Sequence, residues 1–551
     1  MIRKMLVLGV MLGLITATSS AQEAPPDSTP APAQAPATLE SLLAQLPDAD
    51  YATKGSIVTA LVADGSPTAR RTLSALLEGD LYYRNADRVL VSAPEEGTPA
   101  ATDIASGKVI GPANFDELTK IGVNNQLRKV LRGALAALDL ADPDTAVRLS
   151  AVQELMRTID ADSTQMLRAR LEQEKDEDVR AQIMAAVAIN DLGDASADTR
   201  LAAIGSLKGN LNSEVFNRLT ALVTPAEDGT FSEPDARVRA AATETLRSIK
   251  RWRSFYGVIE TMFFGLSLGS VLMLAGIGLA ITFGVMGVIN MAHGELMMIG
   301  AYCVYVVQQL LPNNIGSSIL ISIPVAFVVA GLVGVLIERG IVRFLYGRPL
   351  ETLLATFGVS LILQQLVRDI FSPNNRPVET PSWMAGSLQF NDVLSLTYSR
   401  LYIVLFAAIV FVLLLLVLKR TRLGLHVRAV SQNRAMARAM GIRTDLVDAM
   451  TFGLGSGIAG VAGVALSQLT NVGPNLGQNY IVDSFMVVVF GGVGSLWGTQ
   501  ISGLSLGVAN KLLEPAAGAV LAKILVLVAL ILFIQRRPRG LFPQRGRAAE
   551  G

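Results

Sequence analysis

The polar residues that could do chemistry are scarce and lie among long apolar stretches. The segment Asn290-Met291-Ala292-His293-Gly294-Glu295 joins two such stretches and holds an amide, an imidazole and a carboxyl close together. Polar and ionisable groups at bilayer depth are costly unless they meet partners or water. We therefore expect Asn290, His293 and Glu295 either to form a gate or polar constriction, or to belong to a capped turn at the cytoplasmic surface in which Asn290 or His293 holds backbone groups.

Side-chain amides lie near the outward ends of two further apolar stretches. Gln364 and Gln365 are adjacent, and Gln468 follows a later stretch. An amide offers both a donor and an acceptor to a neutral polar solute, but it serves equally well in contacts between helices. With the glycine-rich turn described below, the candidate lining of a polar pathway is Asn290, His293, Glu295, Gln364, Gln365, Gln468, Gly491, Gly492 and Gly494.

Several kinds of chemistry are not expected. Only two histidines occur, His293 and His426, and they lie far apart, while the single cysteine, Cys303, sits in an apolar run, so we expect no metal site and no disulfide. The phosphate-binding pattern Gly-x-x-x-x-Gly-Lys-Ser/Thr is missing, so we expect no catalytic residue, no cofactor and no ATP site on this chain. A net charge of +1 gives no reason to expect nucleic-acid binding.

The second half of the chain must lie in lipid. Apolar segments recur at 258–288, 297–311, 319–337, 353–370, 401–418, 449–469, 485–513 and 520–534, and a helix needs about 20 residues to cross the hydrocarbon. Arginines gather in 338–351, in 419–448 and after 534, which places these regions in the cytoplasm. The segment 485–513 must then enter and return, as two crossings or as a re-entrant pair, with its turn near Gly491-Gly492-Val493-Gly494.

The longest basic loop contains a short amphipathic helix. Ala435, Met436, Ala439 and Met440 form an apolar stripe, arginines occupy the other face, and Gly441 supplies a left-handed stop. Such a helix could dock against a cytoplasmic partner, or it could rest on lipid headgroups.

The first half of the chain reads as a secreted helical domain. Residues 1–21 have the order of a signal peptide, and 22–37 form a Pro/Ala-rich linker. Residues 38–250 show helical periodicity and a recurring acidic-to-arginine phrase similar to HEAT-type repeats, with copies ending at Arg148, Arg180, Arg200 and Arg239. We expect a small β-hairpin, formed by 88–91 and 108–110, to be inserted among these helices.

Several motifs in fixed order resemble a known family. These are "GVMGVINMAHGELMMIGAY", "IERGIVRFLYGRP", "RLGLHVRAVSQNRAMARAMGI", "VVVFGGVGSLWGTQISGLSLG" and "RRPRGLF". They are similar to the membrane subunits of branched-chain amino-acid and urea ABC importers. In that family the loop helix is the coupling helix that binds the ATPase; carried over, it falls on 430–441, with Arg428, Asn433, Arg434, Met436, Arg438, Met440 and Gly441 as its candidate contacts.

The resemblance implies an all-α, polytopic transmembrane permease, at 254–542, between a periplasmic HEAT-like domain and a cytoplasmic tail at 543–551. It would lie in a bacterial inner membrane and act by alternating access. The implied partners are a second permease subunit, cytoplasmic ATPase subunits that bind the ATP, and a periplasmic solute-binding protein. The secreted extension resembles that of the urea permeases of this family. Urea is therefore the expected solute, with branched-chain amino acids or short amides as the alternative, and a membrane receptor or scaffold as a third possibility.

Overall fold

The computed structural model describes residues 38–94, 100–157 and 159–542. The predicted signal peptide at 1–21, linker at 22–37 and tail at 543–551 lie outside these residues. The chain divides into two compact units between Val187 and Ala188. The described part is mostly helical and has six helices that could span a membrane, so the predicted class of a polytopic helical permease is confirmed.

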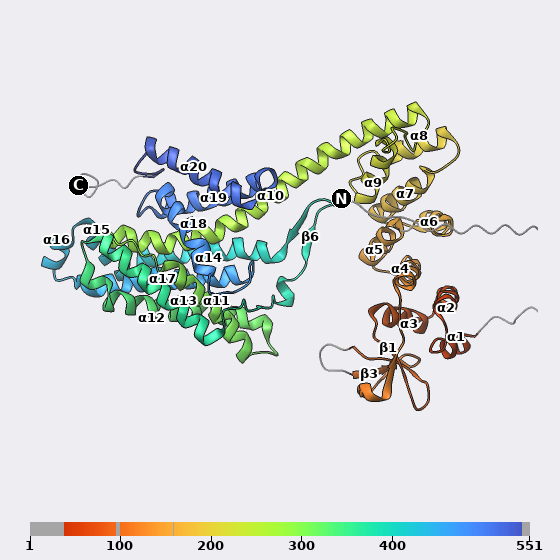
Figure 1. Ribbon diagram of the computed structural model, residues 1–551, viewed down its shortest axis with the longest axis horizontal. Helices are drawn as coiled ribbons and strands as arrows, with labels where there is room; N and C mark the ends of the chain where they lie inside the picture. The colour runs from red at the N-terminus through yellow and green to blue at the C-terminus, as the bar shows by residue number, and fades with distance from the viewer. Residues whose placement is uncertain (1–37, 95–99, 158, 543–551) are drawn as a thin grey trace, which may run out of the picture. The chain divides into compact units, whose positions relative to one another are not determined.

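The first unit combines short helices with one small sheet (Figure 1). Asp50 and Ser66 begin two of these helices by accepting hydrogen bonds from backbone N–H groups that no helical carbonyl can reach. A core of leucine, isoleucine and alanine side chains lies between the helices and the sheet. The helices are α1 (Leu39–Gln45), α2 (Tyr51–Asp64), α3 (Pro67–Glu78), η1 (Phe115–Glu117), α4 (Asn125–Asp139), α5 (Thr145–Arg157), α6 (Ala161–Gln173) and most of α7 (Glu177–Asp191).

The sheet is larger than the predicted hairpin. Its strands are β1 (Leu81–Arg84), β2 (Leu90–Ser92), β3 (Ala100–Asp103), β4 (Val109–Pro112) and β5 (Leu118–Lys120), in the order β4-β3-β2-β1-β5. All the pairings are antiparallel. The two predicted strands correspond to β2 and β4, and the prediction that they pair is wrong because β3 lies between them. The sequence of β3, Ala-Ala-Thr-Asp, lacks the apolar alternation by which a strand is recognised.

Three of the four arginines of the recurring phrase repeat the same contacts, while the fourth, Arg180, donates to the carbonyl oxygen of Leu171. Arg148, Arg200 and Arg239 each donate to the carbonyl oxygens five and six residues upstream, which fixes the turn before their helix. Arg148 also forms a bidentate ion pair with buried Glu174, at 3.0 Å, and Arg200 forms one with buried Glu233, at 2.8 Å. Successive helix pairs are thereby tied together. HEAT-like repeats remain the prediction for this region.

The pKa of Glu174 reports the strength of its hydrogen bonds to Arg148 and Arg170. Burial of the carboxyl opposes its ionisation, but hydrogen bonds from Arg148, from the backbone N–H of Asp176 and from Arg170 outweigh burial. Together they lower the pKa of Glu174 to about 2. The glutamate therefore stays charged at any physiological pH and contributes to the stability of the repeat.

In the second unit, one long helix joins the polar region to the first apolar segment. After α8 (Ala197–Ser206) and α9 (Ser213–Val223), α10 (Ala236–Met286) runs for 51 residues without a break. At about 1.5 Å per residue it is roughly 77 Å long, more than twice the ~30 Å of a hydrocarbon core. The polar stretch predicted to end at residue 250 and the first apolar segment thus share one helix.

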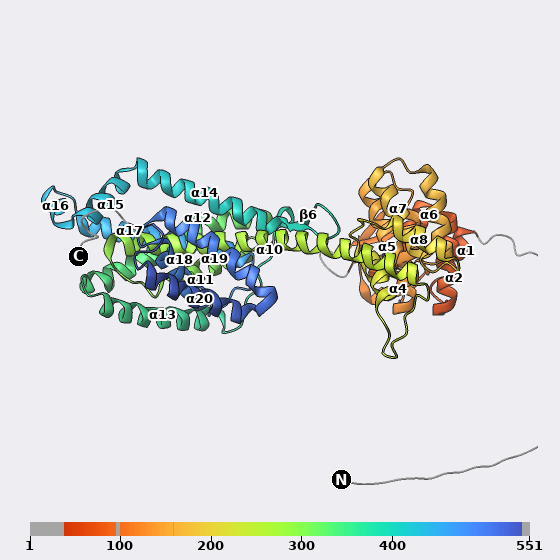
Figure 2. The ribbon, with the colours of Figure 1, turned by 90° about the horizontal axis from the view of Figure 1, so that it is seen from above.

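The membrane part is a bundle of helices (Figure 2). The six helices long and apolar enough to span are α10, α12, α13, α14, α17 and α20. The predicted segment 485–513 forms two helices, α18 and α19. They run antiparallel, since Ser502 on α19 donates to the carbonyl of Val487 on α18 and Gly498 packs on Gly491. After α10 the helices are α11 (His293–Leu310), α12 (Ile315–Gly340), η2 (Val342–Leu345), α13 (Pro349–Phe371), η3 (Ser382–Met384), α14 (Tyr398–Arg420), α15 (Arg422–Gln432), α16 (Arg434–Ala439), α17 (Thr444–Ser467), α18 (Leu476–Gly491), α19 (Leu496–Ala517) and α20 (Ala519–Arg536).

Glycines allow the helices of the bundle to pack in backbone contact. A Cβ at Gly300 of α11 would overlap the backbone of Gly460 on α17, and one at Gly269 of α10 would lie 2.7 Å from the Cα of Leu504 on α19. Small residues of this kind are the usual means of helix association in lipid, where apolar burial alone provides little driving force.

The predicted cytoplasmic regions lie at one end of the bundle. Arg343, in the loop before α13, approaches Asp445 at the start of α17 to 3.9 Å. The backbone N–H of Leu541, after α20, donates to the carbonyl of Phe490 at the end of α18. Figures 1 and 2 show α15 and α16 at this end and β6 (Ser387–Gln389), which pairs with β7 (Ser395–Thr397), at the other. The arginine-rich regions thus share one end, as a common cytoplasmic location requires.

Candidate translocation pathway and coupling site

The carboxyl of Glu295 is the centre of a buried polar cluster. Glu295 lies in the first turn of α11 and is 1% exposed. Its Oε1 accepts hydrogen bonds from Ser360 Oγ at 3.0 Å and from Gln364 Nε2 at 2.7 Å, both on α13. Among the described residues, its Oε2 has no hydrogen-bond partner. The structure thus brings together two of the predicted residues, Glu295 and Gln364, and leaves one acceptor unused.

Asn290 and His293 hold the turn that leads into α11. Asn290 Oδ1 accepts from the backbone N–H of Ala292 at 3.0 Å, and His293 Nε2 lies 2.9 Å from the carbonyl oxygen of Ala275 on α10. Both side chains are buried. In the described chain, Asn290 Nδ2 and His293 Nδ1 lack partners. Asn290 and His293 thus contact backbone groups, as in a capped turn, and the two unpartnered atoms are available to a gate or polar constriction, so both interpretations remain predictions.

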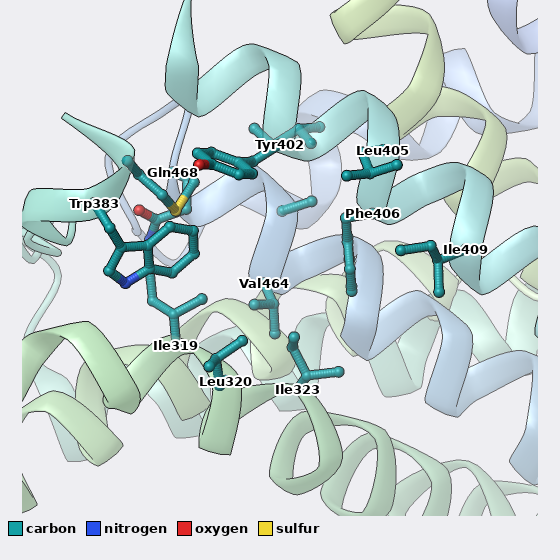
Figure 3. Close-up of a pocket in the computed structure, with 13 residues that line it drawn as sticks. Ile319, Leu320, Ile323, Trp383, Tyr402, Leu405, Phe406, Ile409, Val464 and Gln468 are labelled. Atoms are coloured by element: carbon teal, nitrogen blue, oxygen red, sulfur yellow. The ribbon is translucent and has the colours of Figure 1, made fainter. Parts of the chain in front are cut away.

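The remaining amides lie apart from this cluster. Gln365 is exposed and donates only to Asp369 on its own helix, at 2.8 Å. Gln468 lies at an apolar pocket of about 260 Å³ between α12, α14 and α17, beside Trp383 and Tyr402 (Figure 3). Its Nε2 donates to Ser467 Oγ at 3.2 Å. The sequence grouped these glutamines with Gln364 because it cannot show which face of a helix turns inward.

The glycine turn between α18 and α19 lies at the end that holds the basic loops. A Cβ at Gly284, near the end of α10, would lie 2.5 Å from Gly494, and one at Gly492 would lie 2.7 Å from the carbonyl oxygen of Phe542. Gly492 and Gly494 have positive φ angles, of 99° and 77°. Gly491, Gly492 and Gly494 therefore form a close-packed turn, separate from the Glu295 cluster.

The predicted coupling helix at 430–441 is two helices and not one. Asn433 is extended, with φ −155° and ψ 98°, and it ends α15 while its side chain caps α16 by accepting from the N–H of Met436. The prediction of a continuous helix is wrong at this residue, because an asparagine that can cap a new helix competes with continuation of the old one.

Arginines attach this loop to the bundle. Arg434 forms a bidentate ion pair with Asp448 on α17, and its guanidinium lies 4.0 Å from the centre of the Tyr346 ring. Arg438 donates to Thr444 at 2.9 Å and to Asp445 at 3.1 Å. Arg428 donates to the carbonyl oxygen of Leu418. These arginines point back toward the protein and leave the other face of α16 free.

The apolar stripe of α16 faces outward. Met436 is 59% exposed and Met440 is 76% exposed, while Ala437 between them is buried. Gly441 ends the segment with φ +84°, the left-handed conformation expected from the sequence. The ion pairs of Arg434 and Arg438 fix the helix so that the two methionines are exposed to solvent. Such a surface suits a protein partner, because flexible thioether side chains adapt to apolar grooves.

Sequence reasoning missed a row of small polar residues on α13. Thr352, Thr356, Ser360 and Gln364 are all at most 4% exposed, and each follows the last by four residues. The row is continued by Arg368, which donates to Asn475 at 2.8 Å. The signal was present, since a spacing of four places neighbouring members on one helix face.

Comparisons with known proteins agree with this architecture. Residues 261–534 match the family described as branched-chain amino acid transport system / permease component. The chain is 33% identical over 299 residues to the high-affinity branched-chain amino acid permease LivH of Salmonella typhimurium, covering 52% of this chain and 96% of LivH. It is 30% identical over 296 residues to the permease BraD of Pseudomonas aeruginosa, with the same coverage.

A shorter match links the chain to a sugar permease. It is 32% identical over 110 residues to the ribose import permease RbsC of Escherichia coli, covering 19% of this chain and 34% of RbsC. No solved structure matches the chain. The family match and the near-complete coverage of LivH and BraD together show that this chain belongs to the family of branched-chain amino acid transport permeases.

Proposed function

We propose that this chain is the membrane-spanning subunit of an ATP-driven importer for urea. The family match, together with helices that could span the membrane, supports a permease. The exposed methionines of α16 support docking of a separate ATPase, which would drive alternating access through α15 and α16. A second permease subunit and a periplasmic binding protein would complete the importer.

The choice of urea rests on two features. The first is the helical extension before the permease, which resembles that of the urea permeases and lies outside the residues that match the family. The second is the chemistry of the Glu295 cluster. It presents a hydroxyl, an amide and an unused carboxyl oxygen, groups that can exchange hydrogen bonds with the N–H and C=O groups of a small neutral amide.

One observation favours the alternative solute. Arg368 stands on the same face of α13, one helical turn beyond Gln364, which donates to Glu295. A carboxylate and a guanidinium together could hold the ammonium and the carboxylate of an amino acid. Branched-chain amino acids, which the names of LivH and BraD specify for those proteins, are therefore the second candidate.

Uptake measurements separate the two. Labelled urea and labelled leucine are supplied to cells with the chain, to cells from which it has been deleted, and to deleted cells that carry it on a plasmid. We expect urea uptake to be lost on deletion and restored by the plasmid, with leucine uptake unchanged. Loss of leucine uptake with unchanged urea uptake would overturn the urea assignment in favour of the alternative.

A further inference from the structure

The buried face of α13 is polar along most of the helix. Thr352, Thr356, Ser360 and Gln364 point into the protein, while the apolar residues Leu354, Leu361, Ile362, Leu366 and Ile370 are exposed. Serine, threonine and glutamine side chains also bond neighbouring membrane helices to one another, so the row by itself fits helix packing as well as a path. What points to a path is that the row meets the buried carboxyl of Glu295, because ionisable groups at bilayer depth face the bundle interior or a water-filled cavity and mark solute or ion pathways.

Three members of the row are bonded to one other segment, whereas Thr352 donates to the carbonyl oxygens of Leu345 and Arg348. Thr356 Oγ1 accepts from the backbone N–H of Met291 at 3.1 Å, and Ser360 and Gln364 both donate to Glu295. These contacts join α13 to the turn before α11 and to the first turn of α11. In lipid such hydrogen bonds contribute roughly 0.6–2 kcal/mol each, so α13 can exchange them for bonds to water or solute at little cost.

The outer end of the row opens on a polar recess. Asn475, which accepts from Arg368, lines a cavity of about 350 Å³ together with Asn375, Asn471 and Asn479. The one lysine at the recess, Lys523, is paired with Asp483 at 3.0 Å. The recess therefore presents mainly amides, and it is large enough to hold a small solute with several waters.

We infer that the solute passes between α11 and α13, from the asparagine-lined recess along the polar row of α13. Along this path, an N–H group of the solute donates a hydrogen bond to the carboxyl of Glu295. In the present conformation Ser360 and Gln364 occupy Glu295 Oε1, and Tyr302 of α11 stacks on Phe371 of α13 at a ring distance of 4.8 Å. The path opens when α13 moves away from α11. This inference rests on the proposed function as a permease but not on the identity of the solute.

Cysteine accessibility tests the path directly. In a Cys303→Ser background, Ser360→Cys and Gln364→Cys place thiols on the row, and Leu361→Cys and Leu366→Cys place them on the exposed apolar face. Cells expressing the importer are treated with a charged thiol reagent that does not cross membranes. We expect reaction at the row positions and none at the apolar positions, because a thiol in hydrocarbon does not ionise. We also expect saturating solute to slow the reaction.

Two results would overturn the inference. One is the absence of reaction at Ser360→Cys and Gln364→Cys, in energised and in de-energised cells, while uptake continues. The other is equal reaction on both faces of α13. Ser→Cys is nearly isosteric, so Ser360→Cys keeps the test valid if the larger change at Gln364 prevents folding.

Uptake by serine variants provides an independent measurement. Ser360→Ala removes a hydroxyl that the open path would offer to the solute, and we expect uptake to fall about 3- to 30-fold, the equivalent of one hydrogen bond of about 0.6–2 kcal/mol. Ser322→Ala is the matched control, because Ser322 is equally buried and bonds only to Ser318 O on its own helix. Equal uptake by the two variants would contradict the inference. If Ser360→Cys and Gln364→Cys react in cells that do not import urea, the path between α11 and α13 is supported and only the identification of urea as the solute is refuted.

Discussion

The exposed methionines of α16 give the sharpest test of ATPase docking. Burying a methionine side chain completely is worth about 1.5–3 kcal/mol. Met436 and Met440 are 59% and 76% exposed, so that docking can bury somewhat more than half of each. Each side chain then contributes about 1–2 kcal/mol, and Met436→Ser or Met440→Ser should weaken ATPase binding by about 5- to 30-fold.

The assay titrates the purified ATPase against the permease in nanodiscs and follows ATP hydrolysis in parallel. Leu310→Ser is the matched control, because Leu310 is 74% exposed but ends α11 at the opposite end of the bundle. We expect this control to bind the ATPase normally. Unchanged affinity in Met436→Ser and Met440→Ser, or equal weakening by Leu310→Ser, would refute docking at α16.

Further predictions concern pH, the ion pairs of the helical region and close helix packing. Glu174 has a pKa of about 2 in the folded chain against an ordinary 4.5, so its stabilising contribution is complete above about pH 4.5 and is lost as the pH falls toward 2. Thermal unfolding of the purified protein, followed by circular dichroism from pH 6 to 3, should show this loss. Arg148→Ala should lower stability by about 3–5 kcal/mol at neutral pH, because it removes one partner of a buried pair; an unchanged unfolding temperature would contradict the role given to this pair. Gly300→Val should prevent assembly of the bundle, because its side chain meets the backbone of Gly460, and a normal yield of monodisperse protein in detergent would argue against that packing.

Much of the membrane part could be predicted because its signal is simple. Long apolar runs bounded by arginines locate the helices, and a count of crossings requires 485–513 to enter and return. The structure has two helices there, α18 and α19, with positive φ angles at Gly492 and Gly494 in the turn. Gly441 was likewise predictable, since only glycine ends a helix in this conformation without strain.

Other features depend on information that one sequence does not display. The break at Asn433 results from competition between a capping side chain and a continuing helix, which propensity alone does not decide. Gln364 and Gln365 are adjacent, yet one is buried against Glu295 and the other bonds to Asp369 on the surface. Strand β3 was missed because its residues carry little β propensity and are held by pairing on both sides.

The central claim is that the chain crosses the membrane repeatedly and holds α16 in the cytosol, where an ATPase can bind it. Labelling with a maleimide that does not cross membranes tests it, again in the Cys303→Ser background. Ser317→Cys and Ala439→Cys place exposed thiols in the first turn of α12 and on α16, at opposite ends of the bundle. We predict that Ser317→Cys is labelled in intact cells and that Ala439→Cys is labelled only after the membrane is permeabilised. Labelling of Ala439→Cys in intact cells would contradict the account.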